Sequence, residues 1–195
     1  MKKGIRILGI SDGFSQDRDP KRATEVIGVV FRGGHWLEGV MRIPMRRNGL
    51  NPTDQIARMI TSSPYFEQIR LIMTDGIIFG NHSVVDIGSL HNKTSIPVIA
   101  VSRRTKGTKL LRRVMKGVGE PMSILLTSKK KLLETYRVGL DSDDAKSMVK
   151  MSCTIDIPEP IRVARLFAST FNGLRASDSK KIKLRSRRKI GSISR

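Results

Sequence analysis

The chain has 195 residues, a length that is enough for one domain with a buried core. Of these residues, 38% are hydrophobic and 28% are charged. No apolar run reaches the length of a membrane span, and the apolar stretch after Met1-Lys2-Lys3 is too short for a secretory signal. The single cysteine, Cys153, excludes an intrachain disulfide and fits a reducing compartment. We therefore expect a soluble, cytoplasmic protein.

The charge is strongly basic and unevenly distributed. Lys and Arg number 37 against 17 acidic residues, a net charge of +20. Residues 1–100 hold 13 basic and 9 acidic residues, whereas residues 101–195 hold 24 and 8. Such a field attracts polyanions, so we expect a nucleic-acid partner. A solubility surface, association with the ribosome, or attraction to anionic lipid are the alternatives.

The first hundred residues alternate between strand and helix patterns. Residues 4–11 are apolar and predict a strand, and two more strands, over 26–31 and 36–41, are joined by the hairpin signal Gly33-Gly34. These three strands predict an antiparallel meander.

A parallel unit follows the meander. Asn51-Pro52 predicts the start of a helix that ends near Pro64. Strands are then expected over 69–74 and 96–101, with a short helix over 84–91 between them. This spacing predicts parallel pairing of the two strands.

The basic half predicts further elements: an amphipathic helix over 110–115, a strand over 122–127, and helices over 141–151 and 159–171. The segment SKKIKLRSRRK at 179–189 has 7 basic residues in 11, which predicts a disordered tail that orders on a polyanion. We therefore expect one domain over 1–178, including a C-terminal helical extension, and a basic tail over 179–195.

Two aspartates are the strongest candidates for chemistry. Asp12 and Asp75 each end an apolar strand and precede a glycine. Ligands of open α/β sheets bind at the carboxyl ends of strands, and two carboxylates there would suffice to hold Mg²⁺ or Mn²⁺ against a phosphate. The alternative is that both Asp-Gly pairs are ordinary turns.

Four stretches resemble one archaeal family. GIRILGISDG, VVFRGGHWLEGV, MTDGIIFGNHSVVDI and IPEPIRVARLFAS occur in this order between residues 4 and 172. Together they resemble the archaeal endonuclease dU family, which is related to endonuclease V. The resemblance implies a ribonuclease H-like α/β fold, with a mixed five-stranded sheet whose first three strands are antiparallel, flanked by helices. It also implies metal-dependent cleavage of DNA near deaminated bases, deoxyuridine in particular, with Asp12 and Asp75 as metal ligands.

The sequence departs from the family pattern in two places. Asn51 stands where the resemblance implies an acidic residue, so the ligand there would be an uncharged amide, with Asp54 one turn later as an alternative ligand. The segment 42–47 lacks the proline- and tyrosine-rich wedge of endonuclease V. Asp86 is a further catalytic candidate, for a second metal or a water acting as general acid, and a surface acid paired with arginine is its alternative.

Basic residues are candidates for DNA contact. One group directly follows the predicted strand over 96–101 and would leave the sheet beside the aspartates, and the other lies in the tail. They are Arg103, Arg104, Lys106, Lys109, Lys180, Lys181, Arg187 and Arg188. A solvated loop is the alternative for the first group.

The leading hypothesis is a metal-dependent endonuclease acting on DNA with deaminated bases in repair. A nucleic-acid-binding protein on the same fold, with catalysis weakened or lost through Asn51, is the first alternative. A nuclease directed at RNA is the second, because the fold alone does not decide between them.

Overall fold

A computed structural model describes residues 4–13, 23–46, 51–80, 83–102, 120–126, 131–154 and 156–174. Its strands are β1 (Arg6–Ser11), β2 (Thr24–Arg32), β3 (Trp36–Met45), β4 (Ile69–Asp75), β5 (Ile78–Phe79), β6 (Ser83–Val84), β7 (Val98–Ser102), β8 (Glu120–Leu126) and β9 (Lys131–Val138). Its helices are α1 (Pro52–Thr61), the short 3-10 helix η1 (Phe66–Gln68), α2 (Ile87–Thr94), α4 (Ser142–Ser152) and a helix over residues 159–174.

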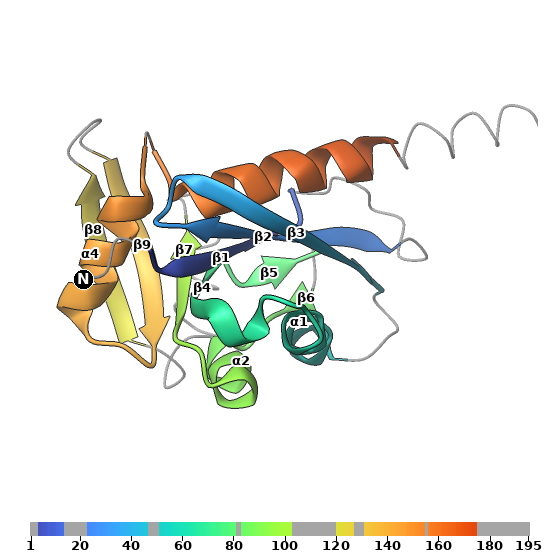
Figure 1. The fold of residues 1–195 in the computed structure, drawn as a ribbon, viewed down its shortest axis with the longest axis horizontal. Helices are drawn as coiled ribbons and strands as arrows, with labels where there is room; N and C mark the ends of the chain where they lie inside the picture. The colour runs from blue at the N-terminus through green and yellow to red at the C-terminus, as the bar shows by residue number, and fades with distance from the viewer. Residues whose placement is uncertain are drawn as a thin grey trace, which may run out of the picture.

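The main sheet has seven strands in the order β3-β2-β1-β4-β7-β9-β8 (Figure 1). Strands β1, β2 and β3 pair with one another in antiparallel fashion, whereas β4 is parallel to both β1 and β7. This confirms the predicted ribonuclease H-like mixed sheet with an antiparallel start. The predicted number of strands is corrected, because the antiparallel pair β9 and β8 extends the sheet beyond β7.

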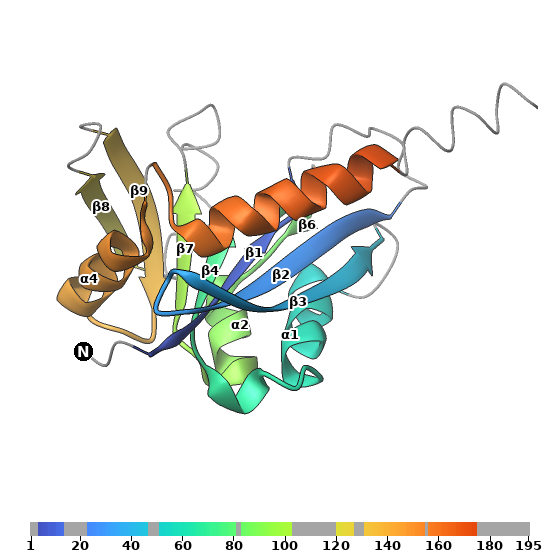
Figure 2. The same cartoon turned by 45° about the horizontal axis from the view of Figure 1, so that its top comes forward.

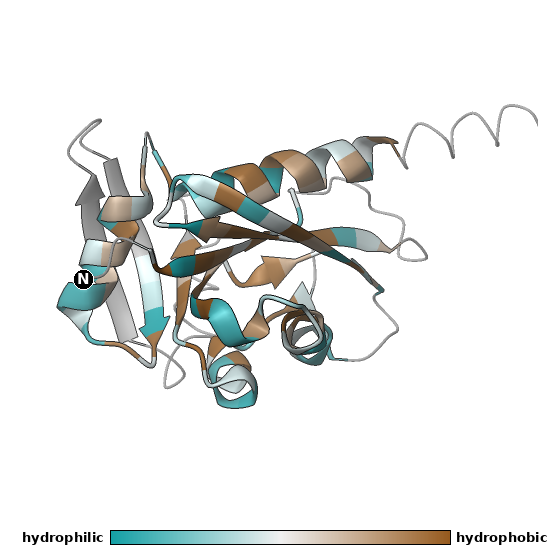
Figure 3. Ribbon diagram, viewed as in Figure 1, coloured by the Kyte–Doolittle hydropathy of each residue, from teal (hydrophilic) through white to brown (hydrophobic). Residues whose placement is uncertain are grey.

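Helices cover both faces of the sheet (Figure 2). Helices α1 and α2 pack on one face, where Ile56, Ile60 and Leu90 join a core cluster with Leu8 and Ile72 of the sheet. On the other face, α4 packs against β4 and β7, and the helix over 159–174 packs against β2. Figure 3 shows the apolar residues concentrated in the central strands, which are buried between the two helix layers.

The helix over 159–174 approaches β1 very closely. A Cβ built on Gly9 would lie 2.2 Å from the carbonyl carbon of Pro160, and one on Gly13 would lie 2.3 Å from the backbone nitrogen of Ser169. Glycine therefore lets this helix lie directly on the strand, and the closeness brings side chains from its buried side to the strand end.

The segment between β4 and β7 differs from the expectation. The helix predicted over 84–91 begins only at Ile87, because Val84 pairs with Ile78 in the small β5–β6 sheet and Asp86 caps the helix. By contrast, α1 begins as predicted, with Asn51 as its N-cap and Pro52 at its first position.

Some expectations lie outside the described residues, namely the helix over 110–115, the tail over 179–195, and thus the division between domain and tail. Within the described ranges, no helix is long and apolar enough to cross a membrane.

Candidate functional site

The two candidate aspartates lie at the ends of neighbouring parallel strands. Ile10 of β1 pairs with Thr74 of β4, so Asp12 and Asp75 follow at the carboxyl ends of the two strands. Strand β7 continues the same edge, because Asp75 pairs with Val101. The topology therefore places both residues at the edge where α/β sheets bind ligands.

Asp75 is held by an arginine that sequence reasoning did not identify. Arg165, from the helix over 159–174, donates from Nε to Asp75 Oδ2 at 2.8 Å and from Nη2 to Oδ1. Both side chains are nearly buried, with 14% of Arg165 and 5% of Asp75 exposed. In this buried position the bidentate pair gives each carboxylate oxygen a hydrogen bond and neutralises the negative charge of Asp75.

Ser11 completes the environment of Asp75. Its hydroxyl donates to Asp75 Oδ2 at 2.7 Å and accepts a hydrogen bond from the Gly13 backbone N–H at 3.1 Å. Because an ionised carboxylate only accepts, this arrangement orients the hydroxyl proton toward Asp75.

Asp12 has different partners. Its Oδ2 accepts a hydrogen bond from the Gly80 backbone N–H at 2.7 Å, and its own carbonyl accepts one from Asn172 Nδ2 at 2.9 Å. Gly80 follows β5 and has a φ of +56°, a conformation that favours glycine. Asp12 is buried, with 6% of its surface exposed.

The alternation of side chains along β1 explains why the two aspartates differ. Leu8 and Ile10 point into the cluster beneath α1, and Asp12 continues that set. Ile7 points to the opposite face, where Leu71 and Met73 precede Asp75, and Ser11 continues that second set. The β1 side chain that reaches Asp75 is therefore Ser11.

The other catalytic candidates, Asn51, Asp54 and Asp86, are helix caps or members of a surface ion pair. Asn51 Oδ1 accepts from the Thr53 N–H at 2.9 Å, and the side chain of Asp86 accepts from the N–H groups of Gly88 and Ser89. Asp54 forms a partly exposed ion pair with Lys93 of α2 at 3.0 Å. Their catalytic roles stay predictions, and each has a structural role that explains its position.

The predicted pair of ligands does not fit a divalent metal ion in this arrangement. Both oxygens of Asp75 already accept hydrogen bonds from Arg165, and Asp12 Oδ2 accepts one from Gly80. Across the part of the chain that is described, no group of three or more His, Cys, Asp or Glu side chains is placed to hold a metal. A cation at Asp75 would have to displace the guanidinium.

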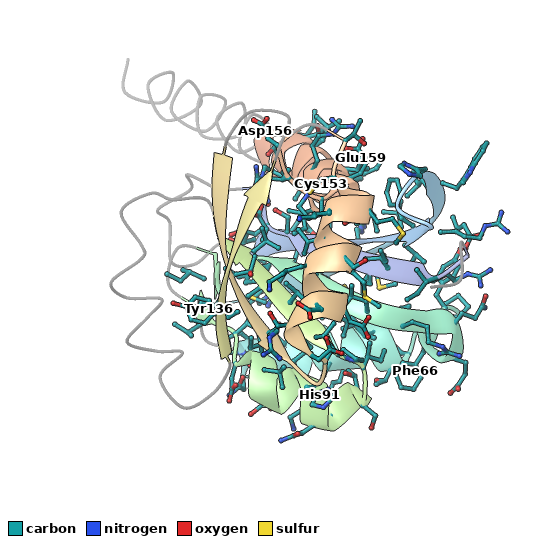
Figure 4. All side chains as sticks on the ribbon, turned by 90° about the vertical axis from the view of Figure 1, so that its left-hand side faces the viewer. Phe66, His91, Tyr136, Cys153, Asp156 and Glu159 are labelled. Atoms are coloured by element: carbon teal, nitrogen blue, oxygen red, sulfur yellow. The ribbon has the colours of Figure 1, made fainter. Side chains whose placement is uncertain are left out.

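The start of the helix that carries Arg165 contains a second ion pair. Arg162 donates to both oxygens of Glu159, at 2.8 and 2.6 Å, and this bond lowers the pKa of the Glu159 carboxyl. Figure 4 shows Cys153 and Glu159 together between α4 and this helix. Burial, followed by the charge of Glu159, raises the pKa of the Cys153 thiol to about 12, so the unreactive protonated form is favoured at neutral pH.

The predicted DNA-contact residues Arg103, Arg104, Lys106, Lys109, Lys180, Lys181, Arg187 and Arg188 lie outside the described residues. Their assignment therefore stays a prediction. Strand β7 pairs with Asp75 through Val101 and ends at Ser102. The basic group that begins at Arg103 therefore follows directly in sequence from a strand end beside Asp75.

Comparison with known proteins identifies the family. The model of the endonuclease dU family matches residues 3–172. The UPF0215 protein of Methanopyrus kandleri is 35% identical over 183 residues, covering 87% of this chain and 92% of the relative.

Solved structures with a similar fold include one archaeal protein and endonuclease V. A protein of unknown function from Archaeoglobus fulgidus superposes with a TM-score of 0.69 at 29% identity, covering 86% of this chain and 98% of that one. Human endonuclease V superposes with a TM-score of 0.57 at 15% identity, covering 89% and 86%. The chain thus has the fold of endonuclease V and belongs to the endonuclease dU family.

Proposed function

We propose that this protein is an endonuclease that cuts DNA near deaminated bases, deoxyuridine in particular, and so serves DNA repair. The observation that carries the proposal is the position of Asp12 and Asp75 at neighbouring strand ends, in a chain that matches a DNA nuclease family over residues 3–172. The net charge of +20 supports the choice of a polyanionic substrate.

In this proposal, hydrogen bonds within the protein fix the carboxyl ends of β1 and β4, which face the phosphate backbone of the DNA. Ser11 and Arg165 fix Asp75, and Asn172 binds the backbone carbonyl of Asp12. Because Arg165 neutralises Asp75, a phosphate that approaches this edge meets less repulsion than two unpaired carboxylates would produce.

DNA contact is assigned to the basic residues that follow β7 and to the tail. Arg103 and Arg104 come directly after Ser102, the last residue of the strand that ends beside Asp75. Lysine and arginine that bind phosphates position a duplex without reading its sequence, which suits an enzyme that must find a lesion in any context.

A second candidate is a DNA-binding protein whose catalysis is weakened or lost. The neutralisation of Asp75 by Arg165 favours it, as does the amide of Asn51 where the family resemblance implies an acid. In this candidate the fold and the positive field are retained for binding alone.

A nicking assay separates the two candidates. Duplexes with one deoxyuridine, one inosine or no lesion, and an RNA duplex, are incubated with the full chain in Mg²⁺, Mn²⁺ or EDTA. Nicking of the lesion duplexes supports the endonuclease. Binding without nicking in any metal supports the second candidate, and cleavage of RNA alone supports a ribonuclease.

Two variants test the assignment of the strand end. Asp75→Asn keeps the shape of the side chain and removes its charge, so nicking should be lost while DNA binding is retained. Glu67→Gln is the matched control, because Glu67 is an exposed acid in η1, before β4. Unchanged nicking by Asp75→Asn would exclude a catalytic role for this carboxylate.

Deletion of residues 179–195 tests DNA binding by the tail. It removes eight basic residues, so binding to any duplex should weaken. The slope of log K against log salt should become shallower by about 0.9 for each phosphate that the tail no longer neutralises. Equal affinity at every salt concentration would exclude binding of DNA by the tail.

A further inference from the structure

The buried ion pair between Asp75 and Arg165 lies where a nuclease of this fold is expected to bind a cation. The carboxylate stands at the carboxyl end of β4, and the guanidinium reaches it from the helix over 159–174, 90 residues later in the chain. With 5% and 14% of the two side chains exposed, water screens their attraction only weakly.

The guanidinium occupies both oxygens of the carboxylate. Nε serves Oδ2 and Nη2 serves Oδ1, while Ser11 adds a second donor to Oδ2 at 2.7 Å. A divalent metal ion binds the same carboxylate oxygens and would lie beside the positive guanidinium, so metal and arginine compete for Asp75.

The surrounding backbone keeps Arg165 in place. Ile161, Ala164 and Ala168 on the same helix are buried, and Gly9 allows the helix start to lie directly against β1. The arginine is therefore presented to Asp75 by a packed helix, and its planar guanidinium loses less side-chain entropy per hydrogen bond than a lysine would.

We propose that Arg165 is a built-in counter-ion that takes the place of a divalent metal at Asp75, so that with a neutral Ser11 beside it Asp75 binds metal only when the guanidinium is removed. Arg165 thereby sets the cation affinity of the resting protein, whether or not the protein cuts DNA.

The neutral side chain of Ser11 on β1 supports the assignment of Arg165 as the counter-ion of Asp75. Ser11 faces Asp75 with a hydroxyl, so the site carries one negative charge, which one guanidinium balances. A second carboxylate at this position would leave an excess negative charge and favour a divalent ion. Asp12 has a different partner, because its Oδ2 accepts a hydrogen bond from the Gly80 backbone N–H.

Direct metal binding tests the proposal without DNA. Mn²⁺ is titrated into the full-length chain, and bound metal is measured by electron paramagnetic resonance together with the melting temperature. Arg165→Gln removes the competing cation and should bind Mn²⁺ about tenfold or more tighter than the wild type. The double variant Arg165→Gln with Asp75→Asn should lose this gain, which assigns the bound ion to Asp75.

Arg162→Gln is the matched control. It removes an arginine one turn earlier on the same helix, which pairs with Glu159 and is itself exposed. Its Mn²⁺ affinity should equal that of the wild type, so an equal gain in both arginine variants would overturn the proposal as a general charge effect.

A second variant keeps the test decisive if Arg165→Gln does not fold. Arg165→Lys keeps the charge but replaces the fork by a single ammonium, which cannot serve both oxygens in the same way. It should bind Mn²⁺ more tightly than the wild type. Wild-type affinity in a folded Arg165 variant, or a wild type that already binds Mn²⁺ through Asp75, would overturn the proposal.

Discussion

Ser11 donates a hydrogen bond from its hydroxyl to Asp75 Oδ2 across the β1–β4 pair, at 2.7 Å. The residue of β1 that meets the acidic end of β4 is therefore a neutral side chain, one position before the aspartate expected there. The charge balance at this strand end depends on Arg165 and Ser11 together, since one neutralises the carboxylate and the other orients it.

Ser11→Asp should turn the ends of β1 and β4 into a binding site for a divalent cation. The substitution places a second carboxylate beside Asp75, and Mn²⁺ affinity should rise by about tenfold, because affinity for hard cations depends on the number of charged ligands. In the absence of metal, the extra buried charge should destabilise the fold by roughly 1–3 kcal/mol. Metal titration and urea unfolding with and without Mn²⁺ measure both effects.

Ser11→Asn serves as its neutral control. It has nearly the same shape as the aspartate variant, so it should show no gain in Mn²⁺ affinity. Equal metal binding by the two variants would contradict the charge argument.

Gly9→Ala should destabilise the protein by about 1–3 kcal/mol or more, because buried overpacking forces the backbone to shift. The added Cβ would lie 2.2 Å from the Pro160 carbonyl carbon, and backbone atoms cannot move aside as a flexible side chain can. The urea midpoint measures the loss. Gly4→Ala is the control, because a Cβ there meets nothing within 4 Å, and a comparable loss in both variants would contradict the close approach of the helix.

Asn172→Ala should weaken the attachment of the helix over 159–174 to the end of β1 and the start of β2. Asn172 donates to the carbonyls of Asp12 and Glu25 and accepts from the Glu25 N–H at 2.8 Å. Loss of these partners for buried backbone groups should cost about 1–3 kcal/mol of unfolding free energy.

Thr170→Ala provides the comparison on the same helix. Its hydroxyl bonds within the helix, to the Leu166 carbonyl, and its side chain is exposed. Its effect should stay within about 0.5 kcal/mol. Hydrogen exchange of the amide of Glu25 should accelerate in Asn172→Ala alone.

Asp86→Ala should cost about 0.5–2 kcal/mol through loss of the α2 cap, whereas Asp86→Asn should retain most of the stability, because an amide oxygen also caps. The carboxylate accepts from two backbone N–H groups and from Ser89 Oγ at 2.7 Å. If Asp86 acts only as a cap, the Asn variant should nick and bind DNA as the wild type does. A folded Asp86→Asn protein without nicking would instead support the predicted catalytic role.

Cys153 should resist alkylation in the native protein. With a pKa of about 12, only about one thiol in ten thousand is ionised at mildly alkaline pH, and the thiolate is the reactive form. Because the chain has a single cysteine, the rate of reaction with a thiol reagent reports on this site alone. The rate should rise by orders of magnitude in denaturant, and equal rates in both states would contradict the burial of the thiol.

The strand ends were predictable, whereas the contacts between them were not. Apolar runs that end in Asp-Gly place Asp12 and Asp75 correctly at the carboxyl ends of β1 and β4. Strand β1 is buried on both faces and therefore lacks an alternation of polar and apolar residues, so its sequence does not tell whether Ser11 or Asp12 faces Asp75.

Arg165 and β9 were missed for related reasons. Arg165 lies 90 residues from its partner, in a helix whose pattern shows which side is buried but not which strand it crosses. Strand β9 carries Lys131, Glu134 and Arg137 among its apolar residues, and its place in the sheet depends on pairing with β7 and β8. Such pairing is a tertiary effect that local propensity does not contain.

The helix over 159–174 can make its contacts with the strand ends only late in folding. Its bonds to the strand ends span 90 residues between Arg165 and Asp75 and 160 residues between Asn172 and Asp12. Contacts of such long sequence separation form slowly, because the intervening chain must be ordered first. During synthesis from the N-terminus, Asp75 emerges from the ribosome long before Arg165, so the acidic strand end carries an uncompensated charge until the last helix docks.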